Sequence, residues 1–295
     1  MKRPPSPKVV AEIGCNHKGD MAIAREMISI AATFAHCDYV KFQKRSNREL
    51  LTPEEYAAPH PNPVNAYGTT YGEHREFLEF NLDQHRQLRQ WCAEFGVGYA
   101  CSAWDVTSAK EIASLEPDYI KIPSACNLDE EMLNYLASEY AGDIHISLGM
   151  TTPAEVDAIF QLLQDRQVCE RVVLYACTSG YPVAFDELCL LEIDKIGQRY
   201  GGQIRAVGFS GHHLGIAADI AAYTLGASWI ERHFSLDRTW KGTDHAASLE
   251  PDGLRRLVRD LNAVEQALTR KEQALLDIEI PQRDKLKRLA NVRPS

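Results

Sequence analysis

The sequence predicts an α/β protein built as a closed (β/α)8 barrel, the TIM-barrel architecture. Eight short apolar runs rich in β-branched residues recur along the chain of 295 residues, and longer segments with helical periodicity separate them. Strands that are apolar on both faces and alternate with helices form parallel sheets. Eight such units over roughly 260 residues fit a closed barrel better than an open, doubly wound sheet.

The expected strands begin near the N-terminus and are spaced along the whole chain. In order, they are KVVAEIG (8–14), YVKFQ (39–43), VGYACSAW (97–104), YIKIPS (119–124), DIHISLG (143–149), RVVLYACTS (171–179), IRAVGFS (204–210) and WIERHFSL (229–236). The clearest helical patterns lie between them, at 21–34, 83–96, 152–166 and 214–227.

Two segments interrupt this alternation. Residues 44–80 are too long and too rich in Pro, Asn and Tyr for a plain connection, and loops of that length are usually functional or disordered. This segment follows the second strand, on the face of the barrel where active sites form. The sequence after residue 270 is charged and has no strand pattern. We therefore expect one catalytic barrel over 1–270 and a helical tail over 271–295.

Charge and cysteine content restrict the possible partners and compartment. The net charge of −9 argues against nucleic acid or an anionic membrane surface as a partner. The eight cysteines form no CxxC pair, and no apolar signal-peptide core follows the basic start MKRPPSPK. No apolar run approaches the ~18 residues that a membrane span needs. The sequence predicts a reduced, soluble, cytoplasmic protein.

Polar residues gather at the ends of the predicted strands, where the chemistry of such barrels takes place. A single serine at such a position is most often a helix N-cap, so the set matters more than any one member. The set consists of Glu12, Lys41, Gln43, Ser102, Lys121, Ser124, Ser147, Ser179, Tyr181, Ser210, His212, His213, Glu231 and His233, with Asp244 a little further on.

Two lysines in this set indicate an anion site. Lys41 and Lys121 lie inside apolar strands, and an ammonium group that faces the barrel interior must find an anion, because its unpaired burial is too costly. Two such lysines on different strands, with several hydroxyl groups near them, are typical of a phosphate or carboxylate pocket.

Two histidines indicate a metal site. A lone histidine in a strand is more often a core residue than a ligand, but His212 and His233 end neighbouring strands, which the barrel places side by side. Two imidazoles, with oxygen ligands from substrate and water, suit Mn²⁺ or a similar divalent ion such as Mg²⁺ or Co²⁺.

The order of the motifs resembles the N-acetylneuraminate (sialic acid) synthase family over roughly residues 8–265. The motifs are VVAEIGCNHKGD, DYVKFQ, YGEHREFLEF, YIKIPSACN, ISLGMTT, CTSGYP, VGFSGHHLGIAADIAAYTLGASWIERHFSLD and GTDHAASLEPD. The resemblance implies a barrel that condenses phosphoenolpyruvate with an open-chain amino-sugar aldehyde. Such a reaction releases phosphate and forms a 3-deoxy-2-ulosonic acid.

The resemblance also implies roles for individual residues. Glu12 matches the catalytic carboxylate, His212 and His233 match the metal ligands, and Lys121 is expected to act in catalysis as well as in binding. Gln43, Tyr181 and Asp244 match the side that binds the acceptor sugar, and Ser179 is a further candidate there. The residues that match the phosphoenolpyruvate pocket are Lys41, Ser102, Lys121, Ser124, Ser147 and Ser210.

The chain departs from the family pattern on the acceptor side. Gly211 stands where members usually have Asp, and His213 where they have Thr. The chain ends about where the linker to the family's C-terminal antifreeze-like domain would begin, so we expect the catalytic barrel alone, acting on a different acceptor aldehyde. We expect His213 to contact that acceptor. The alternatives for His213 are a third metal ligand and an orientation into the helix start.

Two other functions remain open at this stage. The first is a 3-deoxy-ulosonate-phosphate synthase acting on a phosphorylated sugar, which needs an extra basic site, with Arg45 and His74 as weak candidates. The second is a non-catalytic sugar- or phosphate-binding barrel, although a pure binder has no need of Glu12 beside two lysines. The family resemblance also makes a homodimer possible.

Overall fold

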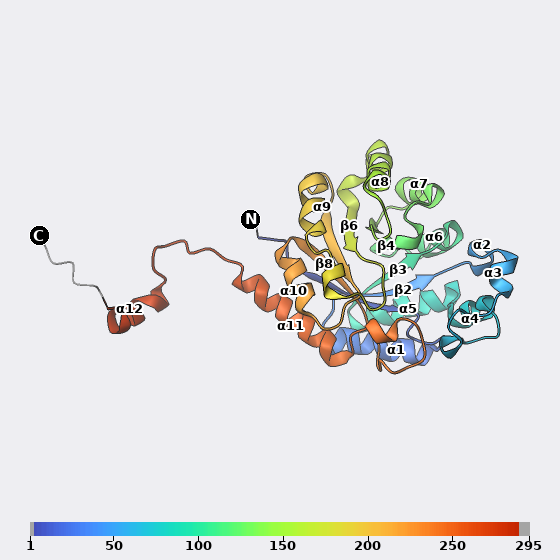
Figure 1. Ribbon diagram of the computed structural model, residues 1–295, viewed down its shortest axis with the longest axis horizontal. Coiled ribbons are helices and arrows are strands. Elements are labelled where there is room, and N and C mark those ends of the chain that lie inside the picture. The colour runs from blue at the N-terminus through green and yellow to red at the C-terminus, as the bar shows by residue number, and fades with distance from the viewer. Residues whose placement is uncertain (1–2, 289–295) are drawn as a thin grey trace, which may run out of the picture.

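Eight parallel strands close into a barrel in which each strand pairs with its neighbours in sequence, and the last pairs with the first. This computed structural model describes residues 3–288 and confirms the predicted (β/α)8 fold (Figure 1). The strands are β1 Lys8–Gly14, β2 Tyr39–Lys44, β3 Gly98–Ala103, β4 Tyr119–Ile122, β5 Asp143–Ser147, β6 Val172–Cys177, β7 Ala206–Gly211 and β8 Ala227–His233.

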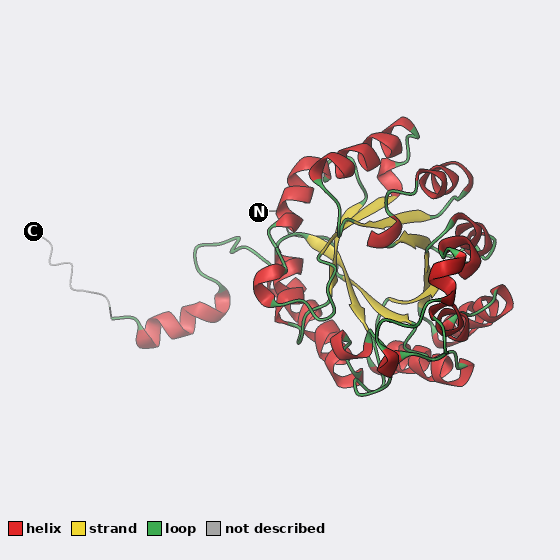
Figure 2. Ribbon diagram, turned by 45° about the vertical axis from the view of Figure 1, so that its right-hand side comes forward, coloured by secondary structure: helices red, strands yellow, loops and turns green. Residues whose placement is uncertain are grey.

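Helices form a ring around the barrel, as Figure 2 shows. The side chains of Asp20, Asn81 and Thr152 accept hydrogen bonds from the first turns of three of these helices, so local sequence fixes where they begin. None of the described helices is long and apolar enough to cross a membrane. The helices are α1 Met21–Ser29, α5 Leu82–Phe95, α6 Val106–Ala113, α7 Glu130–Glu139, α8 Pro153–Asp165, α9 Glu192–Tyr200, α10 Ala217–Thr224 and α11 Pro251–Ala267.

The long segment 44–80 is folded, and it covers one side of the barrel mouth. Capping boxes at Thr52 and Thr70 start two of its helices. Its Tyr67 hydroxyl donates to the carbonyl oxygen of Lys241, 2.5 Å away, so the segment rests on the connection that follows β8. Its helices are α2 Asn47–Leu50, α3 Pro53–Ala57 and α4 Tyr71–Leu78.

An aromatic floor closes the lower part of the barrel interior. His145 stacks on Tyr119 with ring centroids 3.7 Å apart, and its Nδ1 lies 2.9 Å from the hydroxyl of Tyr175. Trp229 packs edge-on against the first two rings. Because side chains alternate along a strand, the residues two positions further along each strand also face the interior, above this floor. The floor therefore separates the polar mouth from the bottom of the barrel.

The C-terminal helix of the barrel is followed by a segment that runs away from it (Figure 1). Helix α11 buries Leu254, Leu257 and Leu261. The hydrogen bonds and ion pairs described for 271–288 join residues of this segment to one another, for example Lys271 to Glu279. The segment contains helix α12, Ile280–Leu286. The remainder of the expected tail, 289–295, lies outside the described residues.

Removal of residues 271–295 should leave the barrel intact, because the hydrogen bonds and ion pairs described for residues 271–288 lie within that segment. We expect the free energy of unfolding to change by no more than about 0.5 kcal/mol in calorimetry or denaturant titration. Leu257→Ala is the matched control and should cost about 2–5 kcal/mol, since its side chain is fully buried. A truncated chain as unstable as this control would contradict the division into a barrel over 1–270 and a separate tail over 271–295.

Candidate active site

A cavity of about 300 Å³ opens at the C-terminal ends of the strands and collects most of the predicted site residues. Its walls come from all eight strands or the connections that follow them, because the interior positions recur every second residue. Trp104, Met150 and Cys177 also contribute. The predicted residues that line it are Glu12, Lys41, Gln43, Ser102, Lys121, Ser124, Ser147, Ser179, Tyr181, Ser210, His212 and His233.

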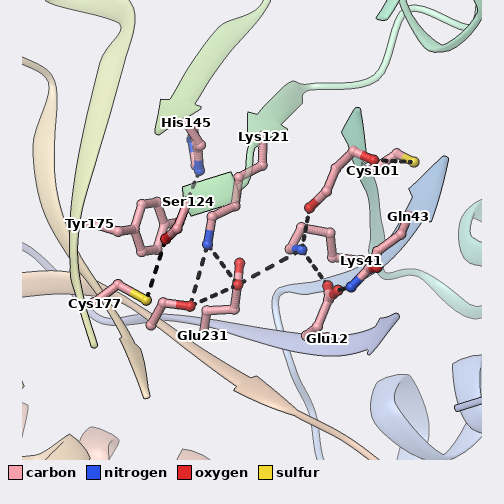
Figure 3. A network of polar contacts seen from close by, with 12 residues as sticks. Glu12, Lys41, Gln43, Cys101, Lys121, Ser124, His145, Tyr175, Cys177 and Glu231 are labelled. Atoms are coloured by element: carbon pink, nitrogen blue, oxygen red, sulfur yellow. Dashed lines mark hydrogen bonds and ion pairs between the residues drawn. The ribbon is translucent and has the colours of Figure 1, made fainter. Parts of the chain in front are cut away.

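Glu231 lies between the two lysines at the base of this cavity (Figure 3). Its Oε1 is 2.6 Å from Lys121 Nζ and 3.8 Å from Lys41 Nζ, and it accepts a hydrogen bond of 3.0 Å from the Ser210 hydroxyl. The sequence motifs assign no role to this carboxylate. Glu231 lies two residues before His233 on the same strand, so both side chains face the barrel interior. This spacing in the sequence indicates that Glu231 belongs to the site.

Glu12 forms the second carboxylate of the network, on the opposite side of Lys41 (Figure 3). It is 1% exposed, and one of its carboxylate oxygens contacts Lys41 Nζ. The other accepts a hydrogen bond of 2.7 Å from the Gln43 amide. Lys41 also donates to the Ser102 hydroxyl, 2.6 Å away. The strand register explains this meeting, because Glu12 pairs with Lys41 on one side and with His233 on the other.

Burial and the neighbouring charges act in opposite directions on the pKa values of Lys41, Lys121 and Glu231. Burial alone would lower the pKa of Lys41, but Glu12 and Glu231 outweigh it and raise that pKa. For Lys121, burial lowers the pKa despite Glu231. Burial acts to raise the pKa of Glu231, yet Lys121 and Lys41 hold it below its usual value. Two ammonium groups thus face two carboxylates, and an incoming anion would compete with Glu231 for the lysines.

Three further serines gather on the β4–β6 side of the cavity. Ser124, Ser147 and Ser179 lie near the backbone of Gly149, and a Cβ there would be 2.6 Å from the hydroxyl oxygens of both Ser124 and Ser179. Only glycine lets the chain approach this closely. The cavity thus presents hydroxyl donors opposite the two lysines, which is a suitable lining for a substrate that carries two anionic groups.

The two predicted metal ligands lie side by side at the cavity mouth, with ring centroids 5.5 Å apart. Burial and the neighbouring His233 lower the pKa of His212 to about 3, so this imidazole is neutral. Its Nδ1 lies 3.0 Å from the carbonyl oxygen of Thr178, which fixes the tautomer and leaves Nε2 with a lone pair. Nδ1 of His233 is buried without a hydrogen-bond partner. Both imidazoles suit a divalent cation. No group of three His, Cys, Asp or Glu side chains that could hold a metal ion occurs among residues 3–288.

The structure corrects the prediction for His213, which does not line the cavity. Its ring is fully buried on the outer side of β7, 3.1 Å from Arg232 and 3.3 Å from Asp219. Arg232 also donates to the backbone carbonyl oxygens of His213 and Gly215. A Cβ at Gly211 would lie 3.0 Å from this ring, so Gly211 and His213 form a packing pair. The alternation of side chains explains the error, because adjacent residues face opposite sides.

Asp244 occupies a small neighbouring cavity of about 20 Å³, between the long segment and the connection after β8. Burial would raise its pKa, but the charges of His233, Arg45 and Arg75 hold it below the usual value. Asp244 therefore lies close to the reaction cavity without lining it. Arg45 and His74, the candidates for a second phosphate site, are both buried and already have protein partners.

Comparisons with known proteins agree with this geometry. Residues 27–273 match the NeuB family. Human N-acetylneuraminate-9-phosphate synthase is 35% identical over 285 residues, which cover 94% of this chain and 76% of the relative. The N,N'-diacetyllegionaminic acid synthase of Campylobacter jejuni is 30% identical, with coverages of 88% and 77%. The sialic acid synthetase of Leptospira borgpetersenii has a similar fold, with a TM-score of 0.80, 23% identity, and coverages of 97% and 94%. The chain belongs to the NeuB family.

Proposed function

We propose that this protein is a transferase that condenses phosphoenolpyruvate with an open-chain sugar aldehyde and forms a 3-deoxy-2-ulosonic, sialic-acid-like acid with release of phosphate. The buried network of Glu12, Lys41, Glu231 and Lys121 carries this proposal. A structural barrel core gains nothing from four charges and an open cavity, because buried charges are costly. An anion-processing site requires both. The names of the human and bacterial relatives, all synthases of sugar acids, support the same reaction class.

The lysine side of the cavity binds phosphoenolpyruvate in this proposal. Lys41 and Lys121 each contact a serine hydroxyl, those of Ser102 and Ser210, so every ammonium group has a neutral partner beside its carboxylate. An incoming phosphate or carboxylate would take over part of these contacts. Lys121 also lies 4.1 Å from the ring centroid of Tyr175, which holds it at the base of the cavity. The serines around Gly149 provide the remaining donors.

Glu12 handles protons in the reaction. The enol carbon C3 of phosphoenolpyruvate forms a bond to the aldehyde carbon, and the C=O π pair of the aldehyde moves onto its oxygen. C2 of phosphoenolpyruvate becomes electron-deficient. Water adds to C2, and Glu12 accepts the proton from that water. The C2–O bond then breaks, the remaining proton of the C2 hydroxyl passes to the phosphate, and phosphate leaves with the bridging oxygen while C2 becomes a ketone. Glu12 passes its proton to the former aldehyde oxygen, which becomes a hydroxyl group. Glu12 is suited to this step because both its oxygens are held by Lys41 and Gln43 in the wall of the cavity.

His212 and His233 would hold the divalent cation, for which we propose Mn²⁺, with Mg²⁺ or Co²⁺ as alternatives. When bound, such an ion supplies Lewis-acid polarisation of the aldehyde oxygen. Tyr181 covers this end of the cavity, with its ring centroid 4.4 Å from that of His212. Gln43 and Tyr181 thus border the space for the acceptor, and Asp244 lies beyond it.

A phosphorylated acceptor is the second candidate, and two cations near Asp244 favour it. Arg75 contacts the Tyr71 hydroxyl, and Lys241 lies 4.8 Å from the ring centroid of Tyr67. Neither forms a salt bridge with any carboxylate in the described part of the chain. Phosphoenolpyruvate contributes three carbons, so a 9-phosphate product, such as that in the human relative's name, comes from an acceptor phosphorylated on C6.

We also propose a cytoplasmic location, because none of the eight cysteines is paired in a disulfide. A homodimer stays a prediction from the family resemblance.

Replacement of the candidate catalytic carboxylate should separate chemistry from binding. We expect Glu12→Gln to lower kcat by about 100-fold or more, because general base catalysis is lost. Phosphoenolpyruvate binding measured by calorimetry should survive. Lys121→Met should instead weaken that binding. Glu155→Gln, at the exposed cap of α8, is the control and should keep full activity. Equal activity of Glu12→Gln and this control in a phosphate-release assay over a panel of aldoses would rule out the assigned role.

Metal removal tests the histidine pair. Chelation should abolish phosphate release, and Mn²⁺ should restore it. Independently of activity, Mn²⁺ at a hundredfold excess over Kd should stabilise the wild type by about 2.7 kcal/mol in thermal unfolding. His212→Ala and His233→Ala should lose this stabilisation, whereas His36→Asn, at an exposed position outside the cavity, should keep it. A stabilisation that survives both alanine substitutions would place the ion elsewhere.

Kinetics with N-acetylmannosamine and with its 6-phosphate as substrates distinguish an unphosphorylated acceptor from a phosphorylated one. If the acceptor is phosphorylated, Arg75→Gln and Lys241→Gln should each raise KM for the 6-phosphate by about tenfold or more, since a charge-assisted hydrogen bond is lost. KM for phosphoenolpyruvate should not change. Lys195→Gln, which removes a surface lysine paired with Glu192, is the control. A wild type that prefers the unphosphorylated sugar would exclude this candidate.

A further inference from the structure

Arg45 is a buried cation that the proposed reaction does not use. It follows β2 directly and is 6% exposed. Glu79 balances its charge, with Nη1 3.1 Å from Oε1, and also accepts from the Arg45 backbone N–H at 3.0 Å. The guanidinium carbon Cζ lies over the Trp104 ring, 3.9 Å from the ring centroid. Because Trp104 lines the reaction cavity, these contacts hold the guanidinium in place behind the cavity wall.

The free end of this guanidinium reaches Gln43. Its Nη2 contacts the amide oxygen Oε1 of Gln43. A guanidinium can only donate hydrogen bonds, so it accepts only one orientation of the amide, with the oxygen toward Arg45. The amide nitrogen then faces the other way and donates to Glu12, 2.7 Å away. Arg45, Gln43 and Glu12 form a chain with a single direction of donation.

The backbone leaves little freedom to this chain. Gly14 has a φ of +56°, and a Cβ there would lie 3.1 Å from Gln43 Nε2 and 3.2 Å from Glu12 Oε1. The Gln43 amide is thus held between the end of β1 and Arg45. One of its two N–H groups is used by Glu12, and Gln43 also lines the cavity. The second N–H is therefore the group that Gln43 can offer to a ligand.

We propose that Arg45 is a positioning residue that fixes the Gln43 amide as a pure donor, with one N–H on Glu12 and the other directed to an oxygen of the acceptor. The role of the second N–H rests on the proposed function, whereas the fixed orientation does not. In an unfixed amide, rotation by 180° would turn the oxygen toward Glu12 and the acceptor. A carbonyl oxygen of the substrate would then face another oxygen and be repelled, and a substrate hydroxyl could only donate to the amide oxygen.

Steady-state kinetics of Arg45 variants test this role. We expect Arg45→Met to lower kcat/KM for the aldehyde by about tenfold or more, since misplacement of a positioned group is costly. KM for phosphoenolpyruvate should change less than twofold, because the lysines are not part of this chain. Arg45→Lys should restore only part of the loss, since a lysine cannot serve Glu79 and Gln43 in the same forked geometry.

Arg171→Met is the matched control, because Arg171 is an arginine that only binds backbone carbonyl oxygens at the opposite end of the barrel. It should lower stability and leave both KM values unchanged. If Arg45→Met leaves both KM values unchanged, as this control does, its role is structural and the proposal is wrong. The proposal is also wrong if Arg45→Met raises KM for the aldehyde and KM for phosphoenolpyruvate by the same factor.

Thermal unfolding tests the Arg45–Gln43 contact without turnover. The losses in melting temperature of Arg45→Met and Gln43→Met should not add up in the double variant, because both remove the same contact. Additive losses would overturn the fixed orientation. If the protein condenses no aldehyde but the losses in melting temperature are non-additive, the proposed function is wrong. The inference that Arg45 fixes Gln43 then still holds.

Discussion

The ion pairs between two buried lysines and two buried carboxylates are the constraint on which the rest of this structure depends. An unpaired ammonium inside a barrel would lose its proton or destabilise the fold. Glu231 lies within ion-pair distance of both Lys41 and Lys121. Glu12 contacts Lys41 from the other side. The same pairing keeps the site charged before a substrate arrives, and it leaves the lysines available to a stronger anion.

The barrel supplies the geometry that this pairing needs. Parallel strands with a side-chain period of two turn polar side chains from every strand into the barrel interior, and the aromatic floor around His145 closes the space below. Above it, the long segment 44–80 positions Arg45 and Glu79 behind the cavity wall. The site thus consists of two lysines at its bottom, the carboxylate of Glu12 beside them, and a pair of imidazoles at the mouth.

The fold and most of the cavity lining could be predicted because the ends of the strands can be located from the sequence pattern. Apolar runs located all eight strands, and the polar residues at their ends line one cavity. Glu231 received no role because its function comes from lysines on β2 and β4, which only the closed barrel brings together. His213 was misplaced because adjacent residues face opposite sides, so the side chain next to His212 points away from the cavity. The roles of Arg45 and Glu79 depend on the folding of a segment without clear periodicity.

The fate of the bridging oxygen of phosphoenolpyruvate tests the central claim most directly. The claim is that the enol carbon attacks an aldehyde in this cavity and that water then adds at C2, so that the C–O bond breaks. With ¹⁸O in the bridging position, the account predicts that the label leaves with inorganic phosphate, as detected by mass spectrometry or ³¹P NMR. Label retained in the organic acid would show P–O cleavage and would contradict the assigned chemistry of Glu12, Lys41 and Lys121.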